Sequence, residues 1–288
     1  MPASPSTPAD RGVFDGGARR PLVITADDLG FSAAVTRGIL DAHRTGIVRS
    51  ASLLVTYPGS AEAAALAACE GGLEVGLHLD LVGGRPAADP SAVRSLVDRE
   101  GRFRPLGEFV RRLFTGRVRA RDVATEVRAQ ARRARSLGIA PLAWDSHRHV
   151  HLIPFVARVV GAVAREEGVR WLRRARSPGP ARGWKPRALS ASTTLSERWF
   201  RGIAGNDWYL DLSSWRTHDP ADLGRMPIGR GVGELGCHPG EVDHEPHRRD
   251  ALAGRRVAEL AMLTEPALLA ALAGDVGWRV PARSSAGG

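Results

Sequence analysis

The sequence contains very little cysteine, almost no lysine and no long apolar run. Cys69 and Cys237 are the only cysteines in 288 residues, too few for a disulfide framework. Lys185 is the only lysine, so the net charge of +10 comes from arginines that are scattered along the chain. Nucleic-acid binding would need basic residues focused on one face. No apolar run approaches the roughly 18 residues of a membrane span. We therefore expect a cytoplasmic protein with no nucleic-acid partner and no stable membrane insertion.

The composition predicts one domain with short unstructured ends. A hydrophobic content of 43% is ordinary for a globular enzyme, and no change in composition divides the chain. Residues 1–20 are rich in proline, alanine, serine and glycine and lack an apolar central region, so they resemble neither a signal peptide nor a helix. We expect a disordered tail over 1–20, a barrel domain over 21–281 and a flexible C-terminus over 282–288.

Short apolar segments alternate with helical patterns along the chain, as in folds with parallel strands and crossover helices. Strands are predicted at 22–25, 52–55, 73–81, 142–145, 171–175, 209–212 and 233–237. Helices are predicted at 32–45, 60–70, 122–137, 154–167, 188–204, 247–262 and 265–273. Residues 83–115 have no clear period and are long enough to be an insertion over a site. About seven such units predict an α/β barrel, in which strand ends converge on one face.

Two adjacent carboxylates, Asp27 and Asp28, follow the first predicted strand, and Gly30 lets the chain turn after them. Two acids in a half-buried site repel each other unless a cation neutralises them or one takes a proton. Adjacent aspartates before a glycine are also common turn and helix-cap residues. The pair alone therefore leaves a metal site and a simple turn both open.

Histidines lie at or near the ends of three further predicted strands: His78, His147 and His238. If the fourth strand ends near His147, this residue lies closest to Asp28 and His78. In the run Asp145-Ser-His-Arg-His-Val-His151 an extended chain would aim alternate side chains to one side, so His149 and His151 are expected to line the cleft. The remaining histidines are expected to face solvent: His43, His218, His244 and His247.

The set Asp28, His78 and His147 suits zinc, manganese, iron, cobalt or nickel better than magnesium, which prefers oxygen ligands. Three protein ligands would leave room for water and substrate. Asp27 could then deprotonate the attacking water, and His238 could protonate the leaving group. This division of roles predicts a hydrolase that acts on an amide or ester carbonyl.

The chain resembles the YdjC-like carbohydrate deacetylase family, which includes chitooligosaccharide deacetylases and hopanoid-biosynthesis deacetylases. The resemblance covers roughly residues 22–272 and rests on five motifs in family order. They are Thr25-Ala-Asp-Asp-Leu-Gly-Phe-Ser32, Gly46-Ile-Val-Arg-Ser-Ala-Ser-Leu-Leu-Val55, Gly76-Leu-His-Leu79, Asp145-Ser-His-Arg-His-Val-His151 and Cys237-His-Pro-Gly240. Leu29 replaces the phenylalanine that family members commonly carry after the acid pair. The tryptophan-rich segment 182–215 matches no family motif, and we expect at least two of its four tryptophans in the core.

The resemblance implies a distorted TIM-like barrel and removal of acetate from an N-acetylated amino sugar, such as an N-acetylglucosamine-containing oligosaccharide or glycolipid. It also implies a divalent metal, magnesium or zinc, held by Asp28, His78 and His147, with Asp27 as base and His238 as acid. An O-acetyl esterase, a phosphoester hydrolase and a non-catalytic sugar-binding protein stay open as alternatives. The sequence also leaves open whether the protein is a monomer or a homodimer.

Overall fold

We analysed a computed structural model of the chain, which describes residues 20–178, 183–214, 230–242, 250, 252–268 and 278–279. The predictions of a disordered tail before Arg20, of a flexible segment 282–288 and of solvent-facing His218, His244 and His247 lie outside these residues. Trp215 and the end of the last predicted helix, after Leu268, also lie outside them.

The described strands form one parallel sheet in the order β5-β4-β3-β2-β1-β7-β6, and β8 pairs with the start of β1. The strands are β1 (Arg20–Leu29), β2 (Ser50–Leu53), β3 (Glu74–Leu79), β4 (Ala143–Ser146), β5 (Trp171–Leu172), β6 (Trp208–Asp211), β7 (Gly233–Cys237) and β8 (Trp278–Arg279). Each of the seven predicted strands overlaps one of β1 to β7, so the α/β prediction is confirmed.

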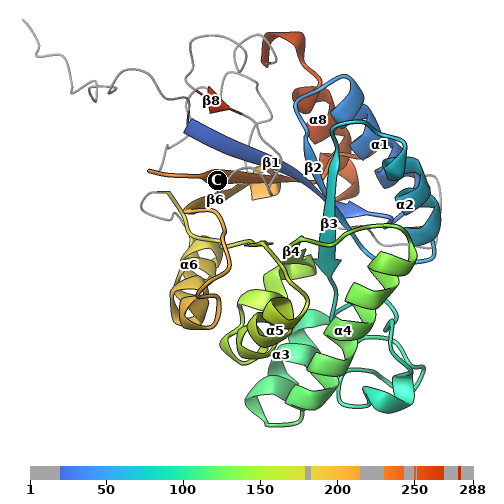
Figure 1. Ribbon diagram of the computed structural model, residues 1–288, viewed down its shortest axis with the longest axis vertical. Helices are drawn as coiled ribbons and strands as arrows, with labels where there is room; N and C mark the ends of the chain where they lie inside the picture. The colour runs from blue at the N-terminus through green and yellow to red at the C-terminus, as the bar shows by residue number, and fades with distance from the viewer. Residues whose placement is uncertain are drawn as a thin grey trace, which may run out of the picture.

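Helices cover one face of the curved sheet and follow one another around it (Figure 1). They are α1 (Ala33–Arg44), α2 (Ser60–Ala68), α3 (Leu106–Phe114), α4 (Ala120–Ser136), α5 (Pro154–Glu166), α6 (Trp184–Ser196) and α8 (Ala253–Leu263). Ser32 caps α1 as expected, because its hydroxyl accepts a hydrogen bond from the Val35 backbone. The prediction of an irregular segment 83–115 is wrong in part, since α3 lies within it, amphipathic and packed through Phe109.

Irregular hydrogen bonds join the edge strands β5 and β6 and bring the sheet close to a barrel. The Leu172 N–H donates to the Ala204 carbonyl (2.9 Å), and the Tyr209 N–H donates to the Arg176 carbonyl (2.7 Å). Between them, the Asn206 amide accepts from the Arg174 N–H and donates to the Arg174 carbonyl. Side-chain and loop bonds thus replace a regular ladder here, which makes the barrel distorted.

The two faces of each strand have different partners. On β1, Leu22, Ile24 and Ala26 belong to the main apolar core between the sheet and the helices. Val23 belongs to a small separate cluster with Ala143 and Trp171 on the inner face. Beyond this cluster, toward the C-terminal strand ends, the inner face carries polar and charged side chains.

Three further predictions can be compared with the structure. The expectation that His43 faces solvent is wrong. The residue is buried, and its ring nitrogens lie 2.8 Å from the Val48 carbonyl and 3.2 Å from the Gly71 carbonyl. Of the tryptophans in segment 182–215, Trp208 is buried, Trp199 is partly buried and Trp184 is exposed. Among the described helices, none combines the length and the apolar character that crossing a membrane requires.

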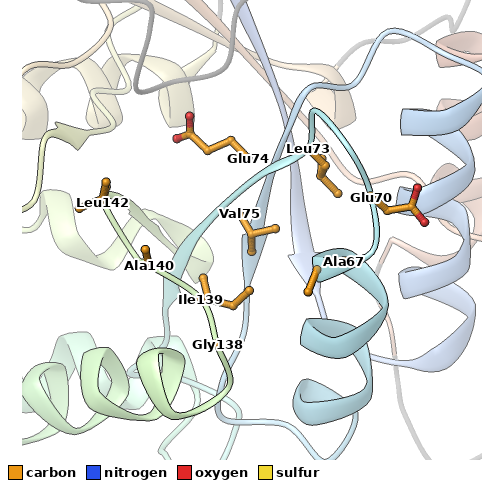
Figure 2. A pocket seen from close by; sticks show the side chains of 10 residues that line it. Ala67, Glu70, Leu73, Glu74, Val75, Gly138, Ile139, Ala140 and Leu142 are labelled. Atoms are coloured by element: carbon orange, nitrogen blue, oxygen red, sulfur yellow. The ribbon is translucent and has the colours of Figure 1, made fainter.

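A shallow pocket of about 420 Å³ lies between the end of α2 and the N-terminal ends of β3 and β4 (Figure 2). Its walls are mostly small and apolar, with Ala67, Val75 and Ile139 among them. Glu70 and Glu74 also line it, but their side chains extend to opposite sides. Since no acid or base converges here, the chemistry is to be sought at the opposite, C-terminal ends of the strands.

Candidate active site

The aspartate pair lies in an irregular stretch of β1, not after its end. Between Ala26 and Leu29 the register with β2 shifts by one residue, so β1 contains a bulge. Asp28 adopts a left-handed conformation there, with φ of 68°. In a regular strand, adjacent side chains would point to opposite faces. The bulge breaks this alternation and brings both carboxylates to the same site.

Asp28, His78 and His147 offer three ligand atoms that lie within 4.8 Å of one another. The Oδ1 atom of Asp28 is 3.0 Å from Nδ1 of His147 and 3.4 Å from Nε2 of His78. Asp28 comes from β1, His78 from β3 and His147 from the residue after β4. The predicted trio is therefore brought together, although its members are far apart in the sequence.

A second layer of charged side chains holds this trio. Nδ1 of His78 lies 2.8 Å from Asp145 Oδ1, and Asp28 Oδ2 accepts a hydrogen bond of 2.8 Å from Arg256. Burial alone would lower the pKa of His78, but the charges of Asp145 and Asp27 raise it to about 10. Burial would raise the pKa of Asp28, but His147 and Arg256 hold it well below its ordinary value. In the doubly protonated imidazole, the Nδ1–H group faces Asp145 and the Nε2–H group faces Asp28.

Asp27 binds Arg173 through both of its oxygens, with contacts of 2.6 and 2.8 Å. The same buried guanidinium lies 2.8 Å from Asp145 Oδ2 and 2.9 Å from Glu234 Oε1. The sequence left open a neutralising cation or a proton on one of the two acids, and the structure places an arginine at each: Arg173 pairs with Asp27, and Arg256 with Asp28. Arg173 also connects Asp27 to Asp145, the carboxylate that orients His78.

His238 follows β7 and lies among three carboxylates. Its Nε2 is 3.9 Å from Asp27 Oδ2, and its Nδ1 is 3.9 Å from both Asp211 Oδ1 and Glu259 Oε2. Burial would lower the pKa of His238, but Asp211 and Glu259 raise it above its ordinary value. Burial raises the pKa of Glu259 to about 7, so Asp211 is the more strongly ionised neighbour. These carboxylates therefore favour the protonated form of the His238 imidazole.

The extended conformation on which the prediction for His149 and His151 depended is not observed. After β4, residues His147–Leu152 form a tight 3₁₀ segment in which Arg148 and His149 adopt left-handed conformations. His149 turns toward Asp211 Oδ2, 4.0 Å away, and its ring meets the edge of Tyr209. His151 is fully buried between the Ser146 hydroxyl and the Arg173 carbonyl, and so it does not line a cleft.

Arg173, Arg256 and most of the second layer of acids were not predicted from the sequence. Arg173 lies in a predicted strand, where a charged residue signals a buried partner. Arg256 and Glu259 share the buried side of α8 with Leu263, at helical spacing, and this pattern could have placed them inside. Asp211 ends β6, which is the same kind of position that drew attention to Asp27.

The side chains present fit a divalent metal ion. Two imidazole nitrogens and one carboxylate oxygen are a common donor set for zinc and related transition metals. A metal-binding histidine usually gives its second nitrogen to a carboxylate, and Asp145 takes this position on His78. Five carboxylates (Asp27, Asp28, Asp145, Glu234 and Asp250) contact two guanidiniums (Arg173 and Arg256), so these ion pairs carry an excess of negative charge. A divalent cation would offset that excess.

Comparison with known proteins gives three consistent findings. The model of the YdjC-like protein family matches residues 21–274. The chain is 34% identical to a carbohydrate deacetylase of Geobacillus stearothermophilus, over 88% of this chain and 93% of that protein. It is 35% identical to a chitooligosaccharide deacetylase of Klebsiella pneumoniae (strain 342), over 91% of this chain and 97% of that protein.

A solved structure agrees with the fold. A protein of Enterococcus faecalis V583, described as a candidate for cellobiose-phosphate cleavage, superposes with a TM-score of 0.78. The match covers 93% of this chain and 99% of that one at 26% identity. The distorted barrel is thus shared over nearly the whole length of both proteins.

Proposed function

The chain belongs to the YdjC-like protein family, and on this premise we propose that it is a metal-dependent carbohydrate deacetylase acting on N-acetylated amino sugars. The observation that carries the proposal is that two sets of side chains, a metal-binding trio and an acid–base pair, converge at one end of the barrel. Asp28, His78 and His147 form a metal-binding trio. Asp27 and His238 stand beside the trio, 3.9 Å from each other.

Asp28, His78 and His147 would hold a divalent ion of zinc or magnesium type, and the imidazole pair favours zinc. When bound, the ion supplies Lewis-acid chemistry, which polarises the acetyl carbonyl and makes water more acidic. His78 must be neutral to bind the ion. The proton on Nε2, the nitrogen that faces Asp28, would be absent with the ion bound, while the Nδ1 proton would stay on the side of Asp145.

Asp27 is assigned the role of general base. Its carboxylate has little freedom to rotate, because both oxygens are bound to Arg173. Each carboxylate oxygen has a second lone pair, so Asp27 can still accept a proton from the attacking water. Arg173 thus fixes the direction in which Asp27 can accept that proton.

His238 is assigned the role of general acid. The raised pKa supports a protonated imidazole in the resting enzyme, and Asp211 lies at Nδ1, away from the nitrogen that faces Asp27. Nε2 is then the nitrogen that would give its proton to the leaving amine. An amine leaves poorly unless it is protonated, so this residue matters most for amides.

The substrate class follows from the relatives and from the two assigned roles. Both relatives above are carbohydrate deacetylases, and one is named for chitooligosaccharides. We assign an N-acetylglucosamine-containing oligosaccharide or glycolipid. Glycosidic cleavage of a cellobiose phosphate fits less well, because it needs a protonated carboxyl group and a second free carboxylate. Here the pKa of Asp28 is lowered and Asp27 is bound by Arg173, while Glu259, whose pKa is raised, is fully buried and accepts a hydrogen bond from the His238 N–H.

The proposal includes the organisation of the chain and its place in the cell. We assign a single barrel domain to residues 21–281. We place the enzyme in the cytoplasm, where thiols stay reduced: Cys69 is exposed and Cys237 is buried, and neither forms a disulfide in the described part of the chain.

Release of acetate and of phosphate from a panel of N-acetylglucosamine oligosaccharides, O-acetyl sugars and sugar phosphates tests the proposal. Acetate should be released from the amides, and a chelator should abolish the reaction. His78→Ala should lose both metal and turnover, whereas His43→Gln, which alters a buried histidine outside the site, should keep the metal. Release of phosphate, or acetate release unchanged after the metal is stripped, would show that the function is a different one.

A further inference from the structure

One arginine of the last described helix reaches both the candidate metal centre and the segment that carries His238. Nη2 of Arg256 donates to Asp28 Oδ2 over 2.8 Å, and Nε donates to Asp250 Oδ2. Nη1 lies 3.4 Å from the His238 carbonyl oxygen. A single planar guanidinium therefore spans a ligand of the trio, an acid outside it and the backbone of the assigned proton donor.

The surroundings fix the position of this guanidinium. The Arg256 side chain is 3% exposed, and its guanidinium carbon, Cζ, lies 5.3 Å from the centre of the Phe31 ring. The Arg256 carbonyl accepts a hydrogen bond from the Gly240 N–H. A Cβ atom on Gly240 would lie 3.0 Å from Cδ of Arg256, so a larger residue at this position would press against the arginine side chain.

The two oxygens of Asp28 consequently have different partners. Oδ2 is occupied by Arg256, while Oδ1 faces His78 and His147. We propose that Arg256 is a positioning residue that keeps Asp28 a one-oxygen ligand of the metal. The proposal rests on the metal site of the proposed function. It adds that the guanidinium, not the strand alone, decides how many oxygens Asp28 offers.

Metal affinity alone would not test this role, because removing Arg256 has two opposite effects. Loss of the hydrogen bond frees Asp28 to rotate, which weakens binding by a ligand that was oriented in advance. Loss of a positive charge beside the site strengthens binding of any cation. The number of Asp28 oxygens that bind the metal distinguishes the two effects. Loss of the orienting hydrogen bond changes this number, whereas loss of the positive charge alone leaves it unchanged.

Cobalt(II) alone is a suitable probe, since X-ray absorption of the cobalt adduct reports the number of nitrogen and oxygen ligands. Wild type, Arg256→Met and Arg255→Met are loaded with one equivalent of cobalt and compared, also by visible absorption. In Arg256→Met the coordination number should rise by about one oxygen, and the visible bands should lose about half of their intensity. Arg255→Met removes an exposed arginine of the same helix and should give the wild-type spectrum.

Identical cobalt spectra for wild type and Arg256→Met would overturn the proposal. If Arg256→Met does not fold, Arg256→Lys keeps the charge but lacks the planar fork that reaches Asp28 and Asp250 together. It should show the same change at smaller size, and a wild-type spectrum for this variant would equally overturn the proposal. Failure of the metal site itself looks different: wild type would then bind no cobalt, or His78→Ala would bind it as well as wild type.

Discussion

The outer and inner faces of the sheet are built by different interactions. On β1, Leu22 and Ile24 pack outward into a continuous apolar core. Thr25 and Asp27 from the same strand face inward, where Thr25 donates to Glu234 and Asp27 pairs with Arg173. Apolar packing is non-directional and tolerates many residue combinations. Buried ion pairs instead need particular partners at particular distances.

This difference explains why the site lies where it does. The inner face is apolar only near its N-terminal end, where Val23, Ala143 and Trp171 meet. Nearer the C-terminal ends, Arg173 draws three carboxylates together and Arg256 holds a fourth. A barrel interior of this kind gives up apolar burial for oriented charge, which is useful for holding a cation and moving protons.

The largest stability effect is expected from Arg173→Met, which breaks the inner network at its centre. Three buried carboxylates would lose their shared cation, and breaking a buried pair costs about 3–5 kcal/mol. Urea unfolding measures this loss. Arg176→Met is the matched control, because its pair with Glu197 is about 40% exposed and contributes at most about 1 kcal/mol. Equal losses of unfolding free energy in the two variants would mean that the buried ion pairs of Arg173 stabilise the fold no more than an exposed pair does.

The catalytic assignment predicts the next effect, on rate instead of stability. Asp27→Asn and His238→Ala should keep the metal and lower turnover on an N-acetyl substrate by about 10²–10⁴-fold, the usual value of a positioned proton transfer. His238→Ala should lose much less on an activated acetyl ester, whose leaving group needs no proton. Acetate release and elemental analysis measure the two quantities. An unchanged amide rate in His238→Ala would remove this residue from the mechanism.

The sequence predicted the outer face and the order of elements well, because both depend on hydrophobic period. Helix α1 and its cap at Ser32 are examples, since local spacing and one hydroxyl determine them. Asp28, His78 and His147 could be placed together because strand ends of a parallel barrel converge, whatever lies between them. These predictions needed no knowledge of side-chain pairing.

The inner network could not be predicted in the same way. Arg173 is one of many arginines, and its partners Asp27, Asp145 and Glu234 come from three different strands. Arg148 and His149 adopt left-handed conformations although neither is a glycine, the residue type that usually indicates such a turn in a sequence. The alternation of side chains that holds in a strand therefore does not continue past the end of β4. As a result, His151 lies in the core and not in the cleft. Long-range pairing of charges leaves little trace in local spacing.

His151 predicts an acid dependence of stability in metal-free protein. Burial lowers its pKa from 6.5 to about 3, so the unfolded chain binds a proton in this range that the folded chain does not. Stability is then complete above pH 6.5 and is lost as the pH falls toward 3, by up to about 1.4 kcal/mol per pH unit. Urea unfolding of wild type and His151→Gln between pH 4 and 8 measures it, and His151→Gln should show a shallower slope. Parallel slopes would contradict the buried, neutral imidazole.

The smallest effects come from neighbouring residues of β1 that face opposite ways. Ile24→Val removes one methylene from the outer core and should cost about 0.5–1.5 kcal/mol. Thr25→Val keeps the shape but removes the hydroxyl that donates to Glu234, and a buried group that loses a partner costs about 1–3 kcal/mol. The two substitutions should also differ in coupling. Combined with Arg173→Met, Ile24→Val should add, whereas Thr25→Val should not, since Glu234 has then already lost its cation. Additivity for both pairs would mean that the inner face packs like the outer one and that its charges do not act as a network.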